Sequence, residues 1–317
     1  MNDKYTAYLT PAEYKAFNSG LEPDQFSGIG TIIQSDAATG AITVFDVVPD
    51  GPADRAGVQQ DDILISIDGK TAKGMKVAEA SNLLRGKRDT AVHVTVQRGT
   101  EQIPISITRE NVRPATVVKH LLPGNIGYIK LYVFGENTAH EFEVALERLQ
   151  NRGARAYVID LRDNGGGYVN AALAISSKFV NSTALVSTES RGGHFETYYG
   201  DNEAIDPKPV AVLANANSAS ASEITIGALQ DSGVATIIGT KTFGKGVMQD
   251  LYPFADGSAI KITVARYFTP KNRDINHIGI VPDVMVPENA NPAYGVPSKD
   301  AQLAAALKLI EDRLAKI

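Results

Sequence analysis

Three serines occupy alternate positions, Ser218, Ser220 and Ser222, in the segment NANSASASEITIGALQDSG at residues 215–233. A serine hydroxyl becomes a nucleophile when a base removes its proton and nearby N–H groups stabilise the negative charge that develops. The apolar residues that follow predict a helix that ends at Gly233, and the first N–H groups of a helix have no partner within it. The segment could therefore present a serine beside an anion-stabilising helix terminus.

Helix capping is the ordinary alternative for the same residues. Ser220 and Glu223 fit the S-x-x-E capping box, in which the serine and the glutamate each satisfy a backbone N–H group. From this segment alone, capping is the better-supported interpretation. Two other segments favour catalysis.

A glycine triplet lies in DLRDNGGGYVNAA, residues 160–172, between a predicted buried strand and a predicted helix. Three consecutive glycines indicate a backbone conformation or a close approach that side chains would block. Their N–H groups could stabilise an oxyanion. A plain loop or a phosphate-binding loop is the alternative, although the spacing does not match G-x-x-x-x-G-K-[ST].

Lys245 is the candidate base, in TKTFGKGVMQD at residues 240–250, between Gly244 and Gly246. A lysine usually has a pKa near 10.4, but burial among apolar residues lowers it and leaves a neutral amine that accepts protons. Gln249 could hold this amine by a hydrogen bond without adding charge. A surface lysine in a glycine-rich turn remains the alternative.

Other catalytic patterns find no match in the sequence. It contains neither H-E-x-x-H nor G-x-S-x-G, and it has no cysteine. Each of the five histidines, at positions 93, 120, 140, 194 and 277, is better explained as a surface or packing residue. We therefore expect a base other than histidine, no metal and no cofactor.

The elements that must position these residues form two groups. Residues 26–110 predict a small, mostly β module with four short strands and one main helix at residues 75–86. Residues 111–317 predict strands that alternate with helices, which indicates an α/β domain, followed by a hairpin and an amphipathic terminal helix. Residues 1–25 are too few to fold alone, and we expect them to pack on the α/β domain.

Composition excludes several classes of partner. The chain has 317 residues and a net charge of -5 with both signs interleaved, so we expect neither nucleic acid nor an anionic membrane surface to bind it. The first twenty residues lack the apolar run of a secretory signal, and no apolar stretch approaches the roughly 20 residues of a membrane helix. We expect a soluble chain without stable membrane insertion.

With these motifs in hand, the chain resembles the C-terminal processing peptidases, the tail-specific serine proteases of family S41 that carry an inserted PDZ domain. The similarity extends over nearly the whole chain and follows the family's order. It is carried by FSGIGTII, VVPDGPADRAGVQQDDILISIDG, IGYIKLYVF, DLRDNGGG, SASASEI, TFGKGVMQ and GIVPDVMV. The resemblance implies an α/β fold with a ClpP/crotonase-like βα protease core (residues 111–317) and an inserted PDZ domain (residues 26–110).

By this resemblance Ser220 is the nucleophile, Lys245 the general base and Gln249 the residue that orients the lysine. The oxyanion hole is implied to consist of the N–H groups of Ala221 and of one glycine of the triplet, Gly166 being our choice. Ser222 then becomes the expected helix cap. The enzyme would be a serine endopeptidase that needs neither metal nor cofactor.

The resemblance also implies how substrate is recognised. The PDZ domain would bind the C-terminal carboxylate of a polypeptide on the N–H groups of Gly28, Ile29 and Gly30, and could gate the active site. Arg85 is the candidate sensor of the bound tail. Such enzymes act outside the cytoplasm, in the periplasm or on the cell-envelope side, and a homodimer is compatible with the resemblance.

Three departures from the family pattern stand out. The export signal and N-terminal helical region typical of the family are missing from this sequence, Asp89 replaces a usual glycine, and TPKNRDIN lacks the usual glycine before its arginine. Two other functions remain as alternatives. A catalytically silent PDZ scaffold would bind tails without turnover, and a crotonase-type acyl-CoA enzyme would bind CoA thioesters.

Overall fold

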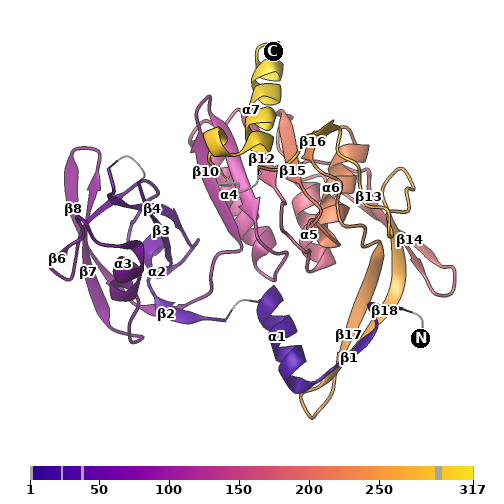
Figure 1. Cartoon of the computed structure of the whole chain (residues 1–317), viewed down its shortest axis with the longest axis horizontal. Helices are drawn as coiled ribbons and strands as arrows, with labels where there is room; N and C mark the ends of the chain where they lie inside the picture. Colours follow the sequence, from indigo (N-terminus) through magenta and orange to yellow (C-terminus); the bar gives the residue numbers. More distant parts are fainter. Residues whose placement is uncertain (1–2, 23, 37–38, 290–294, 317) are drawn as a thin grey trace. The chain divides into compact units, whose positions relative to one another are not determined.

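The computed structural model describes residues 3–22, 24–36, 39–289 and 295–316 (Figure 1). Residues 1, 2 and 23 of the expected N-terminal segment and residue 317 of the terminal helix lie outside the described residues. The chain divides into two compact units. One contains Met1–Glu22 and Thr116–Ile317, and the other contains Pro23–Ala115. The expected boundaries at residues 26 and 110 lie inside the second unit.

A six-stranded sheet forms the centre of the first unit. Its order is β10-β11-β12-β15-β16-β19; β10 is antiparallel to β11, and the other neighbours are parallel. The strands are β10 (Val117–Leu122), β11 (Ile126–Leu131), β12 (Ala156–Asp160), β15 (Val210–Ala214), β16 (Ala235–Gly239) and β19 (Val284–Met285). Every residue of β11, β12, β15 and β16 is buried, as expected of central parallel strands covered on both faces. The α/β prediction is confirmed.

Helices cover both faces of this sheet. One face packs against α4 (Thr138–Asn151), α5 (Val169–Ser177) and α6 (Ala221–Asp231). The other face packs against α7 (Ala301–Leu314), which follows a short 3-10 turn, η1 (Pro297–Lys299), and is drawn in yellow in Figure 1. Because α6 follows β15 directly, its N-terminus lies at the carboxyl end of the parallel strands, where α/β proteins place their sites.

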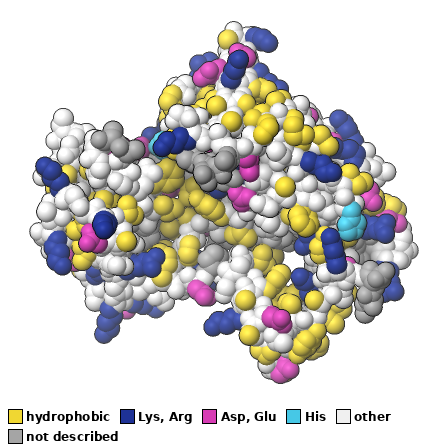
Figure 2. Space-filling model, viewed as in Figure 1, with side chains coloured by type: hydrophobic (Ala, Val, Ile, Leu, Met, Phe, Trp, Pro, Cys, Tyr) yellow, Lys and Arg dark blue, Asp and Glu magenta, His cyan; other side chains and the backbone are white. Residues whose placement is uncertain are grey.

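A second, antiparallel sheet in the same unit carries the lysine segment. Its long strand β18 (Ala259–Phe268) pairs along its length with β17 (Val247–Pro253) in the predicted hairpin. The opposite side of β18 pairs with β1 (Ala7–Leu9) and with β13 (Ala184–Ser190), which pairs in turn with β14 (Phe195–Tyr199). Helix α1 (Pro11–Leu21) follows β1 in the chain and begins at a capping box of Thr10 and Glu13. Hydrophobic side chains gather over the lobe formed by α1, β17 and β18 (Figure 2).

The second unit is the predicted small β module. It has its own core, and its main sheet runs β3-β4-β5-β7-β8, with β6 beside β5 and with β3 at one edge. A separate two-stranded ladder joins β2 to β9. Its elements are β2 (Phe26–Gly28), β3 (Thr31–Ser35), β4 (Ile42–Val47), α2 (Pro52–Arg55), β5 (Ile63–Ile67), β6 (Lys70–Thr71), α3 (Val77–Leu84), β7 (Ala91–Arg98), β8 (Glu101–Thr108) and β9 (Glu110–Val112).

Candidate active site

Ser220 lines a cavity at the start of α6. It is the residue immediately before the helix, and its backbone adopts φ 56° and ψ -117°, a region that non-glycine residues rarely occupy. Such strain persists only where the surroundings enforce it, and it is common at functional sites. The first intrahelical hydrogen bond runs from Ile224 N to Ser220 O at 3.0 Å. The N–H group of Ala221 therefore precedes the hydrogen-bonded part of the helix.

The other two serines of the triplet are fully buried and hold the loop in place. The Ser218 hydroxyl donates to Leu161 O at 2.7 Å and accepts from Asn215 N at 3.0 Å. The Ser222 hydroxyl donates to Asn164 O at 2.8 Å. The expectation that Ser222 caps the helix is wrong, because the capping position belongs to Ser220 and Ser222 bonds to the glycine loop instead.

Glu223 joins the serine segment to the lysine segment. Its carboxylate is fully buried; Oε2 accepts from Ser220 N at 3.0 Å and from Lys245 N at 2.9 Å. Oε1 accepts from the Thr242 hydroxyl at 2.6 Å and from Gly244 N at 2.8 Å. The capping interpretation therefore accounts for one of four hydrogen bonds, and the other three position the lysine segment.

Tyr267, a buried residue of β18, contacts the backbone carbonyl oxygens of Ser220 and Lys245. Its hydroxyl lies 3.2 Å from Ser220 O and also bonds to Lys245 O. Sequence reasoning missed this residue, because nothing in ARYF distinguishes its tyrosine from an ordinary strand residue. Glu223 offered a signal that went unused: it is an acidic residue inside an otherwise apolar helical stretch, which predicts burial with several donors.

Lys245 lines the same cavity as Ser220. Removal from water lowers the pKa of its amine, the positive charge of Lys261 lowers it further, and Glu223 opposes both effects. The flanking positions have no room for a side chain. A Cβ atom on Gly246 would lie 2.7 Å from Asn276 N, and one on Gly244 would lie 2.8 Å from Gly279 N. The pKa of the Lys245 amine is therefore lowered in the cavity that Ser220 also lines.

The glycine triplet packs directly against Ser220. Gly166 has φ +100°, and a Cβ atom there would lie 2.8 Å from Ser220 Cβ and 2.9 Å from Ala221 N. Its own N–H group donates to Asn164 Oδ1 at 2.9 Å, so it would have to leave that partner to bind an oxyanion. The next glycine, Gly167, has φ +146° and forms a β-bridge with Phe134.

The cavity itself has a volume of about 530 Å³. Ser220, Lys245, Gln249 and the three glycines line it, and α1 supplies an apolar wall that includes Phe17 and Leu21. Sequence reasoning did not assign these α1 residues to the site. None of the described residues that line the cavity is a histidine.

Gln249 reaches the cavity, but its amide nitrogen donates to Val247 O at 3.3 Å rather than to the lysine amine. A β-bulge between Met248 and Gln249 sets the direction of this side chain. Its role in orienting Lys245 stays a prediction.

The predicted carboxylate loop and Arg85 lie together within the second unit. Ile29, Gly30 and Arg85 line a small cavity of about 40 Å³ beside the edge strand β3 and helix α3. The Arg85 guanidinium stacks 4.6 Å from the centre of the Phe26 ring, and its Cγ would lie 3.6 Å from a Cβ atom on Gly28. The edge of β3 is suited to the addition of a peptide strand.

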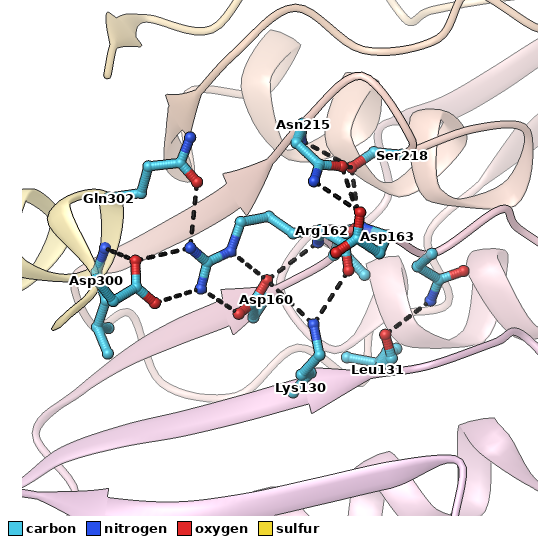
Figure 3. A network of polar contacts seen from close by, with 12 residues as sticks. Lys130, Leu131, Asp160, Arg162, Asp163, Asn215, Ser218, Asp300 and Gln302 are labelled. Carbon is cyan, nitrogen blue, oxygen red and sulfur yellow. Dashed lines mark hydrogen bonds and ion pairs between the residues drawn. The ribbon is translucent and has the colours of Figure 1, made fainter. Parts of the chain in front are cut away.

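A buried ion network lies where β12 ends and α7 begins (Figure 3). Arg162 donates to Asp160 and, through both terminal nitrogens, to Asp300 at 2.7 Å. Lys130 donates to Arg162 O at 3.0 Å. Asp300 also caps α7 by accepting from Leu303 N at 3.0 Å. The network therefore ties the terminal helix to the strand end that precedes the glycine triplet.

The described part of the chain contains no group of three or more acidic, histidine or cysteine side chains arranged to hold a metal ion. Each of its helices is too short or too polar to span a lipid bilayer.

The chain matches peptidase family S41 over residues 125–286 and a PDZ domain over residues 43–98. The carboxyl-terminal-processing protease of Picosynechococcus sp. is 36% identical over 316 residues, which cover 98% of this chain and 76% of that protein. The chain belongs to family S41. It is a serine peptidase with a PDZ domain, as the motifs predicted.

Two further similarities agree with this assignment. The carboxy-terminal processing protease CtpA of Bacillus subtilis is 35% identical over 298 residues, which cover 93% of this chain and 63% of that protein. Among solved structures, the photosystem II D1 C-terminal processing protease is 34% identical with a TM-score of 0.55, covering 90% of this chain and 78% of that one. The S41 peptidase thus shares its overall fold with a C-terminal processing protease.

Proposed function

We propose that this S41 peptidase cleaves polypeptides with Ser220 as nucleophile and Lys245 as general base. The best support is that both residues line one cavity and that Glu223 Oε2 accepts hydrogen bonds from the backbone N–H groups of both. The neutral Lys245 amine takes the Ser220 proton as the oxygen attacks the peptide carbonyl. The resulting ammonium then protonates the leaving nitrogen, and the C–N bond breaks.

Water completes the cycle. It loses a proton to the Lys245 amine and attacks the acyl ester, the bond to Ser220 Oγ breaks, and the serine regains its proton. The Ala221 N–H group and one N–H group of the triplet stabilise the oxyanion in both steps. Gly166 is our choice from the triplet, because a Cβ atom on it would lie 2.9 Å from Ala221 N, and its bond to Asn164 gives way when the substrate carbonyl arrives. Gln249 orients the amine once substrate fills the cavity.

The PDZ domain selects the substrate. The N–H groups of Gly28, Ile29 and Gly30 bind a free C-terminal carboxylate, the tail extends β3, and Arg85 senses the bound tail and transmits its presence to the active site. The names of the similar proteins and the PDZ match support carboxyl-terminal processing. By the same family resemblance the enzyme acts outside the cytoplasm, and a homodimer is its proposed assembly.

Cleavage of an unfolded protein such as casein tests the catalytic assignment. Ser220→Ala and Lys245→Ala should each abolish turnover, whereas Lys241→Ala, an exposed lysine in the same segment, should leave it unchanged. Activity retained in either of the first two variants would refute the dyad. If the parent binds free-tailed peptides but never cleaves them, it is a scaffold instead.

Tail recognition is tested separately, by binding of one peptide with a free and with an amidated C-terminus. The free form should bind more tightly, and Arg85→Ala should lower the stimulation of turnover by added tail peptide. Equal affinity for both forms would rule out carboxylate recognition.

A further inference from the structure

The segment before α1 is fixed to the strand that neighbours the active site. Asp3 accepts from the Thr6 hydroxyl at 2.5 Å and from Tyr5 N at 3.0 Å. The Thr6 hydroxyl, the Thr263 hydroxyl and the Tyr5 N–H group together lower the pKa of its carboxyl to about 2. The Thr6 hydroxyl accepts from Thr263 N at 3.1 Å, and Ala7 begins the antiparallel ladder with β18. The backbone at Tyr5 is therefore held on both sides.

This fixation brings the Tyr5 ring next to the candidate base. The Lys245 amine lies 5.5 Å from the centre of the ring, and the Lys4 amine lies 4.7 Å from it. The Tyr5 hydroxyl is buried and has no hydrogen-bond partner among the described residues. The ring is thus the part of this side chain that meets the lysine, and the hydroxyl adds no interaction there.

The ring has two opposite effects on the charge of Lys245. It excludes water, which favours the neutral amine, and its π face attracts the ammonium form. At 5.5 Å the amine is near the outer limit of about 6 Å for such attraction, so that effect is weak. Removal from water is the largest cause of the lowered pKa of Lys245. We therefore expect exclusion of water by the ring to outweigh its attraction for the ammonium form.

Several titratable or charged groups surround the Lys245 side chain, and they come from three elements. They are Lys4 and Tyr5 of the N-terminal segment, Glu223 of α6, and Lys261 and Tyr267 of β18. The Glu223 carboxylate supports the ammonium form of Lys245, and the charge of Lys261 opposes it. A substitution at Tyr5 leaves these charges unchanged and alters the access of water to the Lys245 amine.

We propose that Tyr5 is a positioning residue that shields the Lys245 amine from water and so keeps the base uncharged. The proposal rests on the function proposed above for Lys245. It assigns a role in the chemistry to a residue 240 positions away in the sequence.

The pH dependence of kcat/KM tests this role. Tyr5→Ala should move the acid limb to higher pH, and each pH unit of that movement lowers turnover at a fixed pH on the limb about tenfold. Tyr5→Phe should retain the parent profile, because the hydroxyl has no partner. Tyr5→Leu should also retain it, because leucine excludes water without offering a π face. Tyr8→Ala is the matched control, since Tyr8 lies in the same segment but is 58% exposed.

A second readout does not need turnover. Acetic anhydride acylates only the unprotonated amine, so labelling of Lys245 over a series of pH values, followed by mass spectrometry, reports its titration in the intact protein. Labelling of Lys245 should require higher pH in Tyr5→Ala than in the parent. Unfolding temperatures measured alongside exclude a global loss of structure.

These outcomes separate the two proposals. If Lys245→Ala remains active but Lys245 labelling shifts in Tyr5→Ala, the dyad is wrong and the shielding role stands. If Lys245→Ala is inactive and Tyr5→Ala, still folded, keeps the parent titration, the shielding role is overturned. A shift to lower pH in both Tyr5→Ala and Tyr5→Leu would also overturn it, because attraction by the ring would then dominate.

Discussion

Ser220 and Lys245, 25 residues apart in the sequence, donate their backbone N–H groups to the same oxygen atom, Glu223 Oε2. Tyr267 contacts the carbonyl oxygens of the same two residues. The relative position of these residues is therefore set by backbone contacts on both sides. The proposed nucleophile and base, held this way, need little reorganisation before reaction.

Glu223→Gln should lower both stability and kcat. A glutamine keeps one acceptor oxygen and turns an NH₂ group toward two of the four donors, and each buried donor left without a partner costs about 1–3 kcal/mol. We expect the free energy of unfolding to fall by about 2–4 kcal/mol. In the folded variant kcat should fall more than KM rises. The exposed Glu147→Gln on α4 is the control; an unchanged kcat in Glu223→Gln would contradict the positioning role.

Lys245→Met should stabilise the protein while it abolishes activity. Because burial lowers the pKa of Lys245, the unfolded chain binds the proton more readily than the folded one. The parent therefore loses stability as the pH falls from the ordinary lysine pKa to the lowered one, and the loss is complete below it. The gain from Lys245→Met should be largest at neutral and acidic pH and shrink toward pH 10.

Urea unfolding at a series of pH values measures this difference, with Lys241→Met as the exposed control. A parent that is more stable than Lys245→Met at pH 6, or a difference that does not vary with pH, would show that the amine is not kept from water.

Gly166→Ala should reduce activity strongly, whereas Gly165→Ala should be tolerated. A methyl group on Gly166 would lie 2.7 Å from Ala219 O and 2.8 Å from Ser220 Cβ, and the residue has φ +100°. Nothing lies within 4 Å of the corresponding position on Gly165. Comparison of the two variants shows whether activity requires the close approach of Gly166 to the serine segment or only a glycine anywhere in the loop. Equal kcat/KM in the two variants would show that the approach is unimportant.

Asp300→Ala should destabilise the first unit by about 3–5 kcal/mol, because it leaves the buried Arg162 without one of its two carboxylate partners. The exposed Asp312→Ala on the same helix should cost at most about 0.5 kcal/mol. Chemical denaturation provides both values. A small effect in Asp300→Ala would mean that Asp160 alone satisfies Arg162.

The periodic parts of the fold were predictable from the sequence. The apolar runs that became β11, β12, β15 and β16 are buried on both faces, and the pattern of such strands is local. The edge strands β1 and β14 and the inner strand β13 were not predicted, because they carry mixed patterns and take their structure from the strands beside them. The cap assigned to Ser222 failed for a similar reason: its partner, Asn164, belongs to another segment.

The sequence by itself determined which functional groups are present: a serine hydroxyl at a helix start, a lysine among apolar residues and a glycine triplet. It also determined the order of motifs, which matches one family. Only the tertiary structure decided how these groups meet. It gave Glu223 three partners in the lysine segment, left the Gly166 N–H group bonded to Asn164, and brought Tyr5 against Lys245. Local patterns encode residue type and secondary structure, whereas contacts between distant segments depend on strand pairing and packing.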